Sequence, residues 1–370
     1  MIPVYVQAYS CFSSVGNEIN LQMENIKHGK RGLLFRESSG LYKTYAGFIA
    51  DVDSSRFIQS ENLSRLESLV VCNLQETLKR SGWTEGDEEP ELILCTTKGN
   101  IDMLRQNFSS QQDGLRLGSM ASRISNEIGF KGKPTVISLA CVSGMAGIIY
   151  GARKIQSGLS NRVLICGFDE LSEFVLRGFA CLKAMDEGRC KPFDIGRSGV
   201  NLGEAVASVM LGPEIHTNGI LVEAGSIRND ANHISGPSRD GEGLFQSITA
   251  SLSKINSDEI GFISAHGTGT LYNDDMEAVA IYRSGLSHVP VNSFKAFTGH
   301  TLGAAGVLES IFCFESFKRN ELYSTPGFEN GNSEYPLDII KETRNVEVNK
   351  ILKLGSGFGG VNAAIVYGRG

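Results

Sequence analysis

The sequence lacks the features that mark membrane-spanning, secreted or nucleic-acid-binding proteins. It has no run of about eighteen apolar residues, which is the length that a membrane span requires. Its first residues, MIPVYVQAYSCFSSVG, contain no basic region followed by a long apolar core, so they do not resemble a signal peptide. The formal net charge is −6, and no block of lysine or arginine favours nucleic-acid binding. We therefore expect a cytoplasmic protein that binds neither a membrane nor a nucleic acid.

The cysteines lack the spacing of a disulfide framework or a zinc site. There are eight of them, and no two form a CxxC pair: Cys11, Cys72, Cys95, Cys141, Cys166, Cys181, Cys190 and Cys313. In a chain of 370 residues this pattern is typical of free thiols in a reducing compartment. We expect no metal, and we expect most of these cysteines to be small buried side chains. A functional role for any of them needs local support.

Short apolar runs alternate with helical stretches along the chain, and this alternation predicts an α/β protein with largely buried sheets. Hydrophobic residues make up 41% of the sequence and charged residues 21%, as in ordinary globular proteins. The expected strands are 91–95, 135–140, 162–167, 205–212, 261–265, 289–294, 351–355 and 362–368. The clearest helices are expected at 143–158 and 302–320.

A weak internal repeat divides the chain into two halves, 1–213 and 214–370. PTVISLACVSGMAGIIYGARKI and VPVNSFKAFTGHTLGAAGVLESIF share a strand, a polar turn and a helix that begins with glycine and alanine. Many α/β proteins yield such matches, so the repeat alone does not establish two related halves. No Pro-rich linker separates them, which favours one compact body.

Cys141 occupies an unusual position, between the apolar run TVISLA and the small residues of SGMAG. A turn between a strand and a helix presents its side chain at the helix N-terminus, where the helix dipole favours a thiolate. The same residues also fit a core cysteine followed by a core helix. On this stretch alone the structural interpretation is favoured somewhat over the catalytic one.

Two histidines follow expected strands in loops of small and hydroxyl residues. His266 opens HGTGT after GFISA, and His300 ends SFKAFTGH. Active sites of α/β sheets lie at the carboxyl ends of strands, where Cys141, His266 and His300 are all expected. His28, His216 and His288 lie in polar surroundings and are expected on the surface.

Two further features belong to the same candidate site. Lys295 lies five residues before His300 in an apolar segment, so it either reaches solvent or pairs with a buried acid such as Glu309. In LGSGFGGVN, four glycines surround Phe358, and exposed backbone N–H groups there would suit an oxyanion hole. A plain glycine-rich turn explains the same residues. It is not the GxGxxG fingerprint of a dinucleotide site.

Together these motifs resemble those of the β-ketoacyl-acyl carrier protein synthases, the condensing enzymes of the thiolase-like superfamily. The resemblance covers nearly the whole chain, through ACVSG, KPFDIGRSGVNLGEA, DANHISGP, AHGTGTLYNDDMEA, KAFTGHTLGAAG and GFGGVNA in the family's order. It implies a five-layered αβαβα fold with two pseudo-repeated halves. It also implies decarboxylative condensation with malonyl-acyl carrier protein, in fatty acid, polyene or polyketide synthesis.

The resemblance also assigns roles to the candidate residues. It makes Cys141 the nucleophile that carries the acyl chain, and His266 and His300 the two histidines of a Cys-His-His triad. It makes Phe358 an aromatic gate, whose N–H forms the oxyanion hole with that of Cys141. The half 1–213 would then carry the nucleophile, and 214–370 the histidines.

The remaining implied roles concern support and substrate binding. Lys295 and Glu309 match the family's buried lysine and glutamate, and Thr268 and Thr270 match the hydroxyls that hold the phosphopantetheine arm. No cofactor is implied beyond that arm, which the carrier protein brings. The implied partners are an acyl carrier protein and a second synthase chain, in a homodimer or in a heterodimer with a related subunit.

Several departures and rival interpretations remain. Leu139 and Ser356 stand where the family usually has threonine and phenylalanine, and the chain is shorter than typical members around 100–125 and before KPFD. A thiolase would need a second cysteine in the glycine-rich motif, and a cysteine hydrolase would not use Lys295 or a second histidine. A non-catalytic partner or scaffold subunit, such as a chain length factor, is the main alternative, although such subunits normally lack the cysteine.

Overall fold

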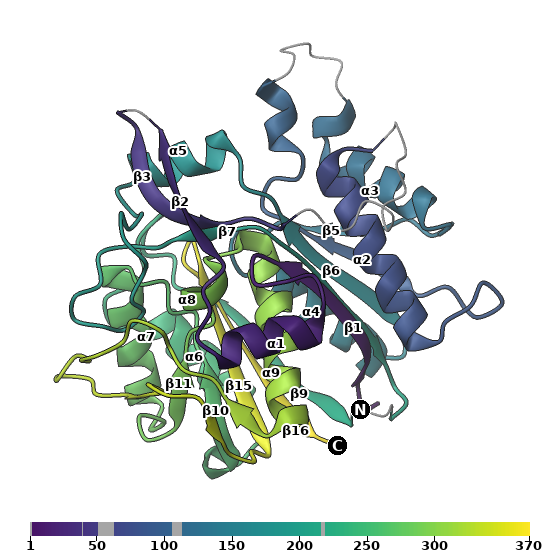
Figure 1. Ribbon diagram of the computed structural model, residues 1–370. Helices are drawn as coiled ribbons and strands as arrows, with labels where there is room; N and C mark the ends of the chain where they lie inside the picture. The colour runs from purple at the N-terminus through teal and green to yellow at the C-terminus, as the bar shows by residue number, and fades with distance from the viewer. Residues whose placement is uncertain (1, 39, 51–62, 106–112, 216–218) are drawn as a thin grey trace.

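The computed structural model describes residues 2–38, 40–50, 63–105, 113–215 and 219–370 (Figure 1). Its α-helices are α1 (Ile19–Lys27), α2 (Arg65–Ser81), α3 (Leu117–Glu127), α4 (Ser143–Gln156), α5 (Glu173–Cys181), α6 (Glu242–Ser251), α7 (Leu271–Arg283), α8 (Lys295–Thr298) and α9 (Ala305–Arg319). Both expected helices are confirmed, as α4 and α9. His216 lies outside the described residues, and so does part of 100–125, one of the regions where the chain is shorter than typical family members.

All eight expected strands are present. The main sheet contains β1 (Tyr5–Ser13), β4 (Glu91–Cys95), β5 (Thr135–Ile137), β6 (Val163–Asp169), β8 (Ala205–Gly212), β9 (Ile220–Asn229), β10 (Ile260–Ser264), β11 (Pro290–Asn292), β13 (Asp338–Ile339), β15 (Lys350–Gly357) and β16 (Val361–Arg369). Short strands β2 (Leu33–Ser38), β3 (Tyr42–Gly47), β7 (Leu202–Gly203), β12 (Glu321–Leu322) and β14 (Arg344–Asn345) lie outside it. β5 and β11 are shorter than expected, because the chain leaves each strand to form a loop of the candidate site.

The main sheet consists of two groups of strands that meet at one narrow junction. Its order is β13-β11-β10-β15-β16-β9-β1-β8-β6-β4-β5. β1 and β8 pair along their whole length, whereas β1 meets β9 at a single pair, Tyr5 with Leu221. Each group is therefore nearly a separate sheet. The strands of one group, β1, β8, β6, β4 and β5, all come from the first half of the chain, and those of the other group all come from the second half.

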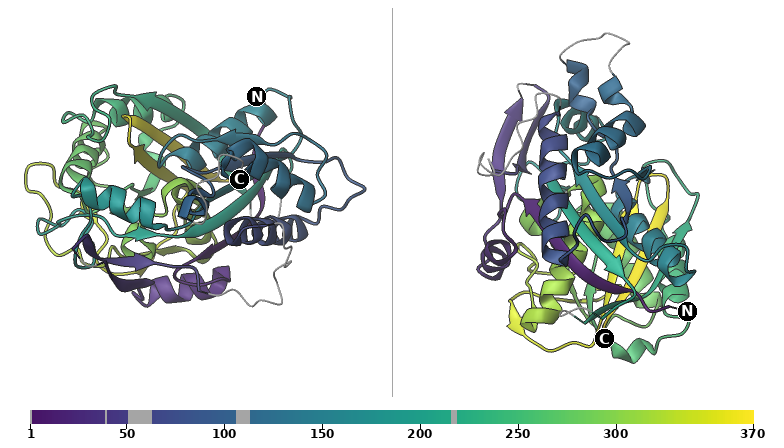
Figure 2. Two further views of the ribbon diagram at one scale, coloured as in Figure 1. Left: turned by 90° about the horizontal axis from the view of Figure 1, so that it is seen from above. Right: turned by 90° about the vertical axis from the view of Figure 1, so that its right-hand side faces the viewer.

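Helices cover both faces of both groups of strands, so the molecule has five layers (Figures 1 and 2). α2 and α3 pack on the outer face of β8, β6 and β4, and α6 and α7 on the outer face of the other group. α4 and α9 lie between the groups and contact strands of both. This arrangement confirms the predicted five-layered αβαβα architecture. No helix in the described part of the chain is long and apolar enough to cross a bilayer.

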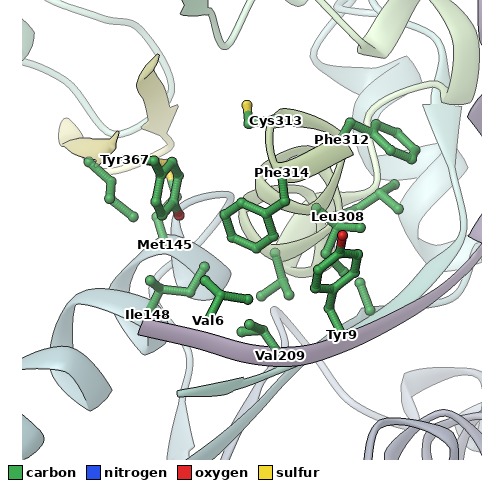
Figure 3. Close-up of a cluster of buried hydrophobic side chains, with 14 of the residues drawn as sticks. Val6, Tyr9, Met145, Ile148, Val209, Leu308, Phe312, Cys313, Phe314 and Tyr367 are labelled. Carbon is green, nitrogen blue, oxygen red and sulfur yellow. The ribbon is translucent and has the colours of Figure 1, made fainter. Parts of the chain in front are cut away.

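The two-residue period of the strands separates the middle core from the outer cores. In β8, Ala207 and Val209 face the middle layer, whereas Val206 and Met210 face α2. The middle core is rich in aromatic residues from α9, and Phe314 lies there among side chains from β1, α4 and β8 (Figure 3). Strands buried on both faces need apolar residues at nearly every position, which explains the continuous runs seen in the sequence.

Glycines allow α4 and α9 to approach closely in the middle layer. A Cβ atom added at Gly306 would lie 2.3 Å from the backbone nitrogen of Met145 and 2.9 Å from the carbonyl carbon of Gly144. Neither atom belongs to a flexible side chain, so a methyl group there would force the helices apart. The small residues after Cys141 therefore serve the packing of the helix that follows it.

Gly306→Ala is expected to lower the free energy of unfolding by about 1–3 kcal/mol, as overpacking in a core does. Urea denaturation of the purified chain measures the effect. Gly178→Ala, in α5, is the matched control, because a Cβ atom at Gly178 meets nothing within 4 Å. Equal unfolding midpoints for the two variants would contradict the close approach of α4 and α9.

Candidate active site

A cavity of about 460 Å³ collects the residues that the sequence singled out. Its lining includes Cys141, His266, Thr268, Thr270, His300 and Phe358. Both histidines come from loops that follow parallel strands, β10 and β11, and Cys141 follows β5. Lys295 and Glu309 lie behind the histidines and outside the cavity wall. The structure thus brings together every residue of the expected site.

A sharp turn places Cys141 at the start of α4. The preceding residue, Ala140, has φ of +45°, a left-handed conformation that is costly for alanine. Ser143 Oγ stabilises the turn, because it accepts a hydrogen bond from the Leu139 N–H at 2.8 Å and donates one to the Ala140 carbonyl at 2.6 Å. The strained backbone conformation therefore lies at Ala140, directly before the residue that bears the thiol.

Burial governs the protonation of Cys141. It raises the pKa of the thiol to about 11, while Lys295 and the backbone N–H groups of Phe358 and Cys141 lower it. We expected the start of α4 to favour the thiolate, and the net direction is the opposite because desolvation is the larger effect. The N–H groups of Phe358 and Cys141 are the two that would form an oxyanion hole, and they lie close enough to the sulfur to lower its pKa.

His266 and His300 lie side by side. Their ring centroids are 5.1 Å apart, with the ring planes at 86°. Burial lowers the pKa of both imidazoles well below the usual value, and Lys295 lowers both further. His300 is 2% exposed, and neither of its ring nitrogens hydrogen-bonds to any described residue. Buried polar groups are rarely left unpaired, so these nitrogens indicate a site for a ligand.

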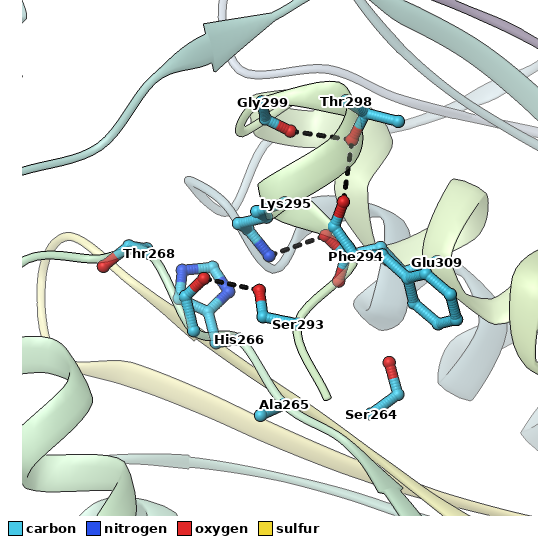
Figure 4. Close-up of polar contacts among 12 residues, drawn as sticks. Ser264, Ala265, His266, Thr268, Ser293, Phe294, Lys295, Thr298, Gly299 and Glu309 are labelled. Carbon is cyan, nitrogen blue, oxygen red and sulfur yellow. Dashed lines mark hydrogen bonds and ion pairs between the residues drawn. The ribbon is translucent and has the colours of Figure 1, made fainter. Parts of the chain in front are cut away.

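Lys295 forms a buried ion pair with Glu309, as the sequence allowed. The Lys295 Nζ lies 2.6 Å from Glu309 Oε1, and the lysine is completely buried. In Figure 4 the ammonium points to Glu309 from a position next to the His266 ring. The alternative that Lys295 reaches solvent is wrong.

The HGTGT loop is held from below by two acids of α7. Glu277 accepts hydrogen bonds from the N–H groups of His266 and Gly267, at 2.7 and 2.6 Å. Asp274 accepts from the N–H groups of Thr268 and Gly269. The Thr268 and Thr270 hydroxyls lie 2.9 Å apart on the cavity wall. The loop backbone is therefore fixed, and its hydroxyls face the cavity.

The glycine-rich turn forms the opposite wall. The ring of Phe358 stacks on Phe179 of α5 at 5.7 Å and is 38% exposed, so it lies at the surface of the cavity. Ser356 hydrogen-bonds to the side chain of Asn362 at 2.8 Å and lines the cavity below it.

Two family models together match most of the chain. The model described as "Beta-ketoacyl synthase, N-terminal domain" matches residues 3–215, and the corresponding C-terminal model matches residues 219–329. The chain belongs to the beta-ketoacyl synthase family. The fold and the order of the motifs agree with this assignment.

The relatives of this ketosynthase-family chain include polyketide ketosynthases and 3-oxoacyl-[acyl-carrier-protein] synthases. It is 29% identical to the "Tetracenomycin polyketide synthase ketoacyl synthase alpha subunit" of Streptomyces glaucescens, over 84% of this chain and 82% of that protein. It is 25% identical to a 3-oxoacyl-[acyl-carrier-protein] synthase 2 of Vibrio harveyi, over 98% of both. Among solved structures, a chain of the ketosynthase–chain length factor complex from Xenorhabdus doucetiae is 26% identical, with a TM-score of 0.88 over 100% of this chain and 98% of that one.

Three buried charged residues of this ketosynthase-family site were not singled out from the sequence. In the sequence, Asp274 and Glu277 were noted only as members of the motif AHGTGTLYNDDMEA, and Lys353 only as a residue of the expected strand 351–355. Lys353 lies 2.5 Å from Glu309, on the carboxylate oxygen that Lys295 does not contact. For Lys353, the sequence feature that could have indicated a role was a single lysine inside an otherwise apolar strand.

The role of Lys295 can be tested through the reactivity of Cys141. Lys295→Met removes the cation that lowers the pKa of the thiol, so alkylation by iodoacetamide at pH 8 is expected to slow by about tenfold for each unit that the pKa rises. Lys154→Met in α4 removes an ion pair with Glu91 instead and serves as the control. An unchanged alkylation rate in Lys295→Met would contradict this coupling.

Proposed function

We propose that this chain is a β-ketoacyl-acyl carrier protein synthase that forms an acyl thioester on Cys141 and condenses it with a malonyl thioester. The observation that carries the proposal is the buried pair His266 and His300, with both His300 nitrogens unpaired, in one cavity with Cys141. A core cysteine would not need two neutral imidazoles beside it. Neither a hydrolase nor a thiolase uses this set.

In the first step the acyl group passes from the carrier thioester to Cys141. The sulfur attacks the acyl carbonyl, and the negative charge on the carbonyl oxygen is stabilised by the N–H groups of Phe358 and Cys141. The bond to the carrier sulfur breaks, and the proton of the Cys141 thiol ends on the departing carrier thiol. A neutral histidine is a suitable relay for that proton, because each neutral ring has one N–H and one lone pair.

In the second step a malonyl thioester loses CO₂. The bond between the α-carbon and the carboxylate breaks, and its electron pair forms an enolate whose oxygen carries negative charge. His266 and His300 donate hydrogen bonds to that oxygen. In a dry site such donors stabilise a developing charge far more than they would in water.

In the third step the enolate carbon attacks the acyl carbonyl on Cys141. The same two N–H groups stabilise the resulting oxyanion, and its collapse breaks the bond to sulfur. The β-ketoacyl product leaves on the carrier protein, and the released thiolate of Cys141 takes a proton from solvent to restore the thiol. The half 1–213 thus supplies the nucleophile, and the half 214–370 supplies the histidines and the hydroxyls Thr268 and Thr270 for the phosphopantetheine arm. No step needs a redox cofactor.

The proposed partners are an acyl carrier protein and a second synthase chain. One neighbour of similar fold is titled as a type II polyketide synthase acyl carrier protein in complex with its ketosynthase. Others are titled as ketosynthase and chain length factor pairs. A homodimer and a heterodimer both fit this family. The proposed substrates are carrier-protein thioesters of fatty acid, polyene or polyketide synthesis, and the assay below compares acyl lengths to distinguish these pathways.

The test is to incubate the purified chain with acyl- and malonyl-carrier protein and to analyse both by mass spectrometry. The proposal expects an acyl adduct on Cys141 and a β-ketoacyl product on the carrier. A set of acyl lengths, alone and with a candidate partner subunit, covers the substrate and dimer alternatives. Absence of adduct and product throughout would favour the non-catalytic partner instead.

A further inference from the structure

The run ILKLG contains a lysine in a strand that is buried on both faces. Along β15, Leu352 and Leu354 face the outer core, whereas Ile351 faces the middle layer. Lys353 alternates with the leucines and shares the face of Ile351, and it is 1% exposed. An apolar side chain would fill that position at no electrostatic cost. A buried lysine therefore calls for an explanation other than packing.

The ammonium of Lys353 joins three elements. Its Nζ lies 2.5 Å from Glu309 Oε2 on α9 and donates to the Leu354 carbonyl at 2.8 Å. The carbonyls of Ser264 and Ala265, each at 3.4 Å, accept its remaining hydrogen. Ser264 is the last residue of β10, and Ala265 directly precedes His266. Lys353 thus connects the strand that presents His266 to the acid that pairs with Lys295.

The charges around this cluster do not balance. Two ammonium groups, Lys295 and Lys353, share the single carboxylate of Glu309. On α7, burial raises the pKa of Glu277 to about 7, and on α9 burial raises the pKa of the Cys313 thiol to about 12. The lysines also act on the pKa values of His266 and His300, and Lys295 acts on that of Cys141. Burial lowers the pKa of Lys295 itself. Near neutral pH the cluster therefore places an excess positive charge behind the two histidines.

We propose that Lys353 is a positioning residue for decarboxylation: it fixes Glu309 and the backbone before His266, and it places a second positive charge behind both histidines. The inference rests on the proposed condensation. Burial lowers the pKa of both imidazoles most, Lys295 lowers it further, and Lys353 adds to the same shift. The influences on Cys141 instead include Lys295 and Asp169. The two lysines therefore differ in what they affect: Lys353 contributes to the histidine pKa values, whereas Lys295 contributes to those and to the pKa of the thiol.

Neutral histidines matter because the malonyl carboxylate loses its charge as CO₂ leaves. A histidinium beside it would stabilise the charged ground state and would raise the barrier to decarboxylation. A neutral N–H still stabilises the enolate oxygen as charge develops there. The second lysine thus favours the transition state over the ground state.

The test compares Lys353→Met with wild type between pH 5 and 8. Decarboxylation of malonyl-carrier protein by Lys353→Met is expected to fall below wild type most strongly toward pH 5 and to approach wild type at pH 8, because the ratio of protonated to neutral histidine changes about tenfold for each unit by which the histidine pKa rises. Alkylation of Cys141 is expected to keep the wild-type pH profile. Lys353→Arg keeps the charge and is expected to restore most of the lost rate at pH 6.

Lys350→Met is the matched control. Lys350 lies on the same strand, and its ion pairs with Glu223 and Glu259 are remote from the cavity. A proportional loss of decarboxylation and alkylation with no change of pH profile would overturn the proposal, because a purely structural role predicts that result. Decarboxylation equal to wild type at every pH would overturn it as well.

Carbon-13 NMR titration of the labelled imidazoles separates this inference from the proposed function. It is expected to show histidine pKa values raised in Lys353→Met, and it needs no turnover. Unchanged histidine titration would contradict the role of Lys353 even in an active enzyme. If the methionine variant does not fold, Lys353→Arg titrated in the same way decides: histidines that remain neutral down to pH 6 support the role of the charge, and histidines that protonate there refute it.

Discussion

Replacing Cys141 with alanine is expected to lower condensation by at least about 10³-fold, because the acyl chain then has no covalent attachment. Decarboxylation of malonyl-carrier protein should continue, since His266, His300 and the cation behind them are all retained. Mass spectrometry of the protein reports the adduct, and release of CO₂ reports the second half-reaction. The two readouts therefore separate the nucleophile from the histidines within one variant.

Cys313→Ala is the matched control for this variant. Cys313 is a buried thiol on α9 outside the cavity lining, whereas Cys141 is half-buried and lines the cavity. Its replacement is expected to leave the adduct on Cys141 intact. Full condensation by Cys141→Ala, or an acyl adduct on another cysteine, would contradict the assignment of the nucleophile.

Replacing His300 with alanine is expected to lower decarboxylation by about 10²–10³-fold, the usual cost of losing a donor to a developing oxyanion. The buried ring makes no hydrogen bond within the described chain, so its removal breaks none that supports the fold. The rate of Cys141 acylation is expected to fall less, because the N–H groups of Phe358 and Cys141 stabilise the transition state of that step. The rate of CO₂ release and the rate of adduct formation measure the two effects.

His288→Ala serves as the control, because His288 is exposed and lies outside the cavity lining. Urea denaturation of both variants tests whether the fold is preserved. A loss of acylation as large as the loss of decarboxylation in His300→Ala would show that the ring acts mainly on the first step. Unchanged decarboxylation would remove His300 from the proposed mechanism.

The local parts of the fold were readable because burial on both faces imposes a continuous apolar run on each strand. The run AVASVMLG became β8 with the same bounds, and SGMAGIIYGARKIQSG became α4 with a difference of two residues at its end. The short strands β5 and β11 were overestimated. Beyond these strands Leu139 packs against the middle core and Phe294 is buried in it, and an apolar pattern does not distinguish such packing from strand pairing.

The acids of the site were harder to recognise. Asp274 and Glu277 lie one turn apart on a helix that also carries exposed residues, so in the sequence they resemble a solvated face. Only the fold shows that both turn toward the backbone of the preceding loop. Lys353 was hidden for the opposite reason, because the pattern of its strand was so apolar that a single lysine did not change the interpretation.

The sequence by itself determined the alternation of strands and helices, the order of the family motifs, and the identity of the nucleophile and histidine candidates. These depend on residue types at short spacing, which local physics constrains. Only the tertiary structure decided that Cys141 is held as a thiol, that His300 has unpaired nitrogens, and that two lysines share Glu309. Those properties arise from desolvation and from contacts between residues far apart in the chain, and neither is encoded in any single stretch.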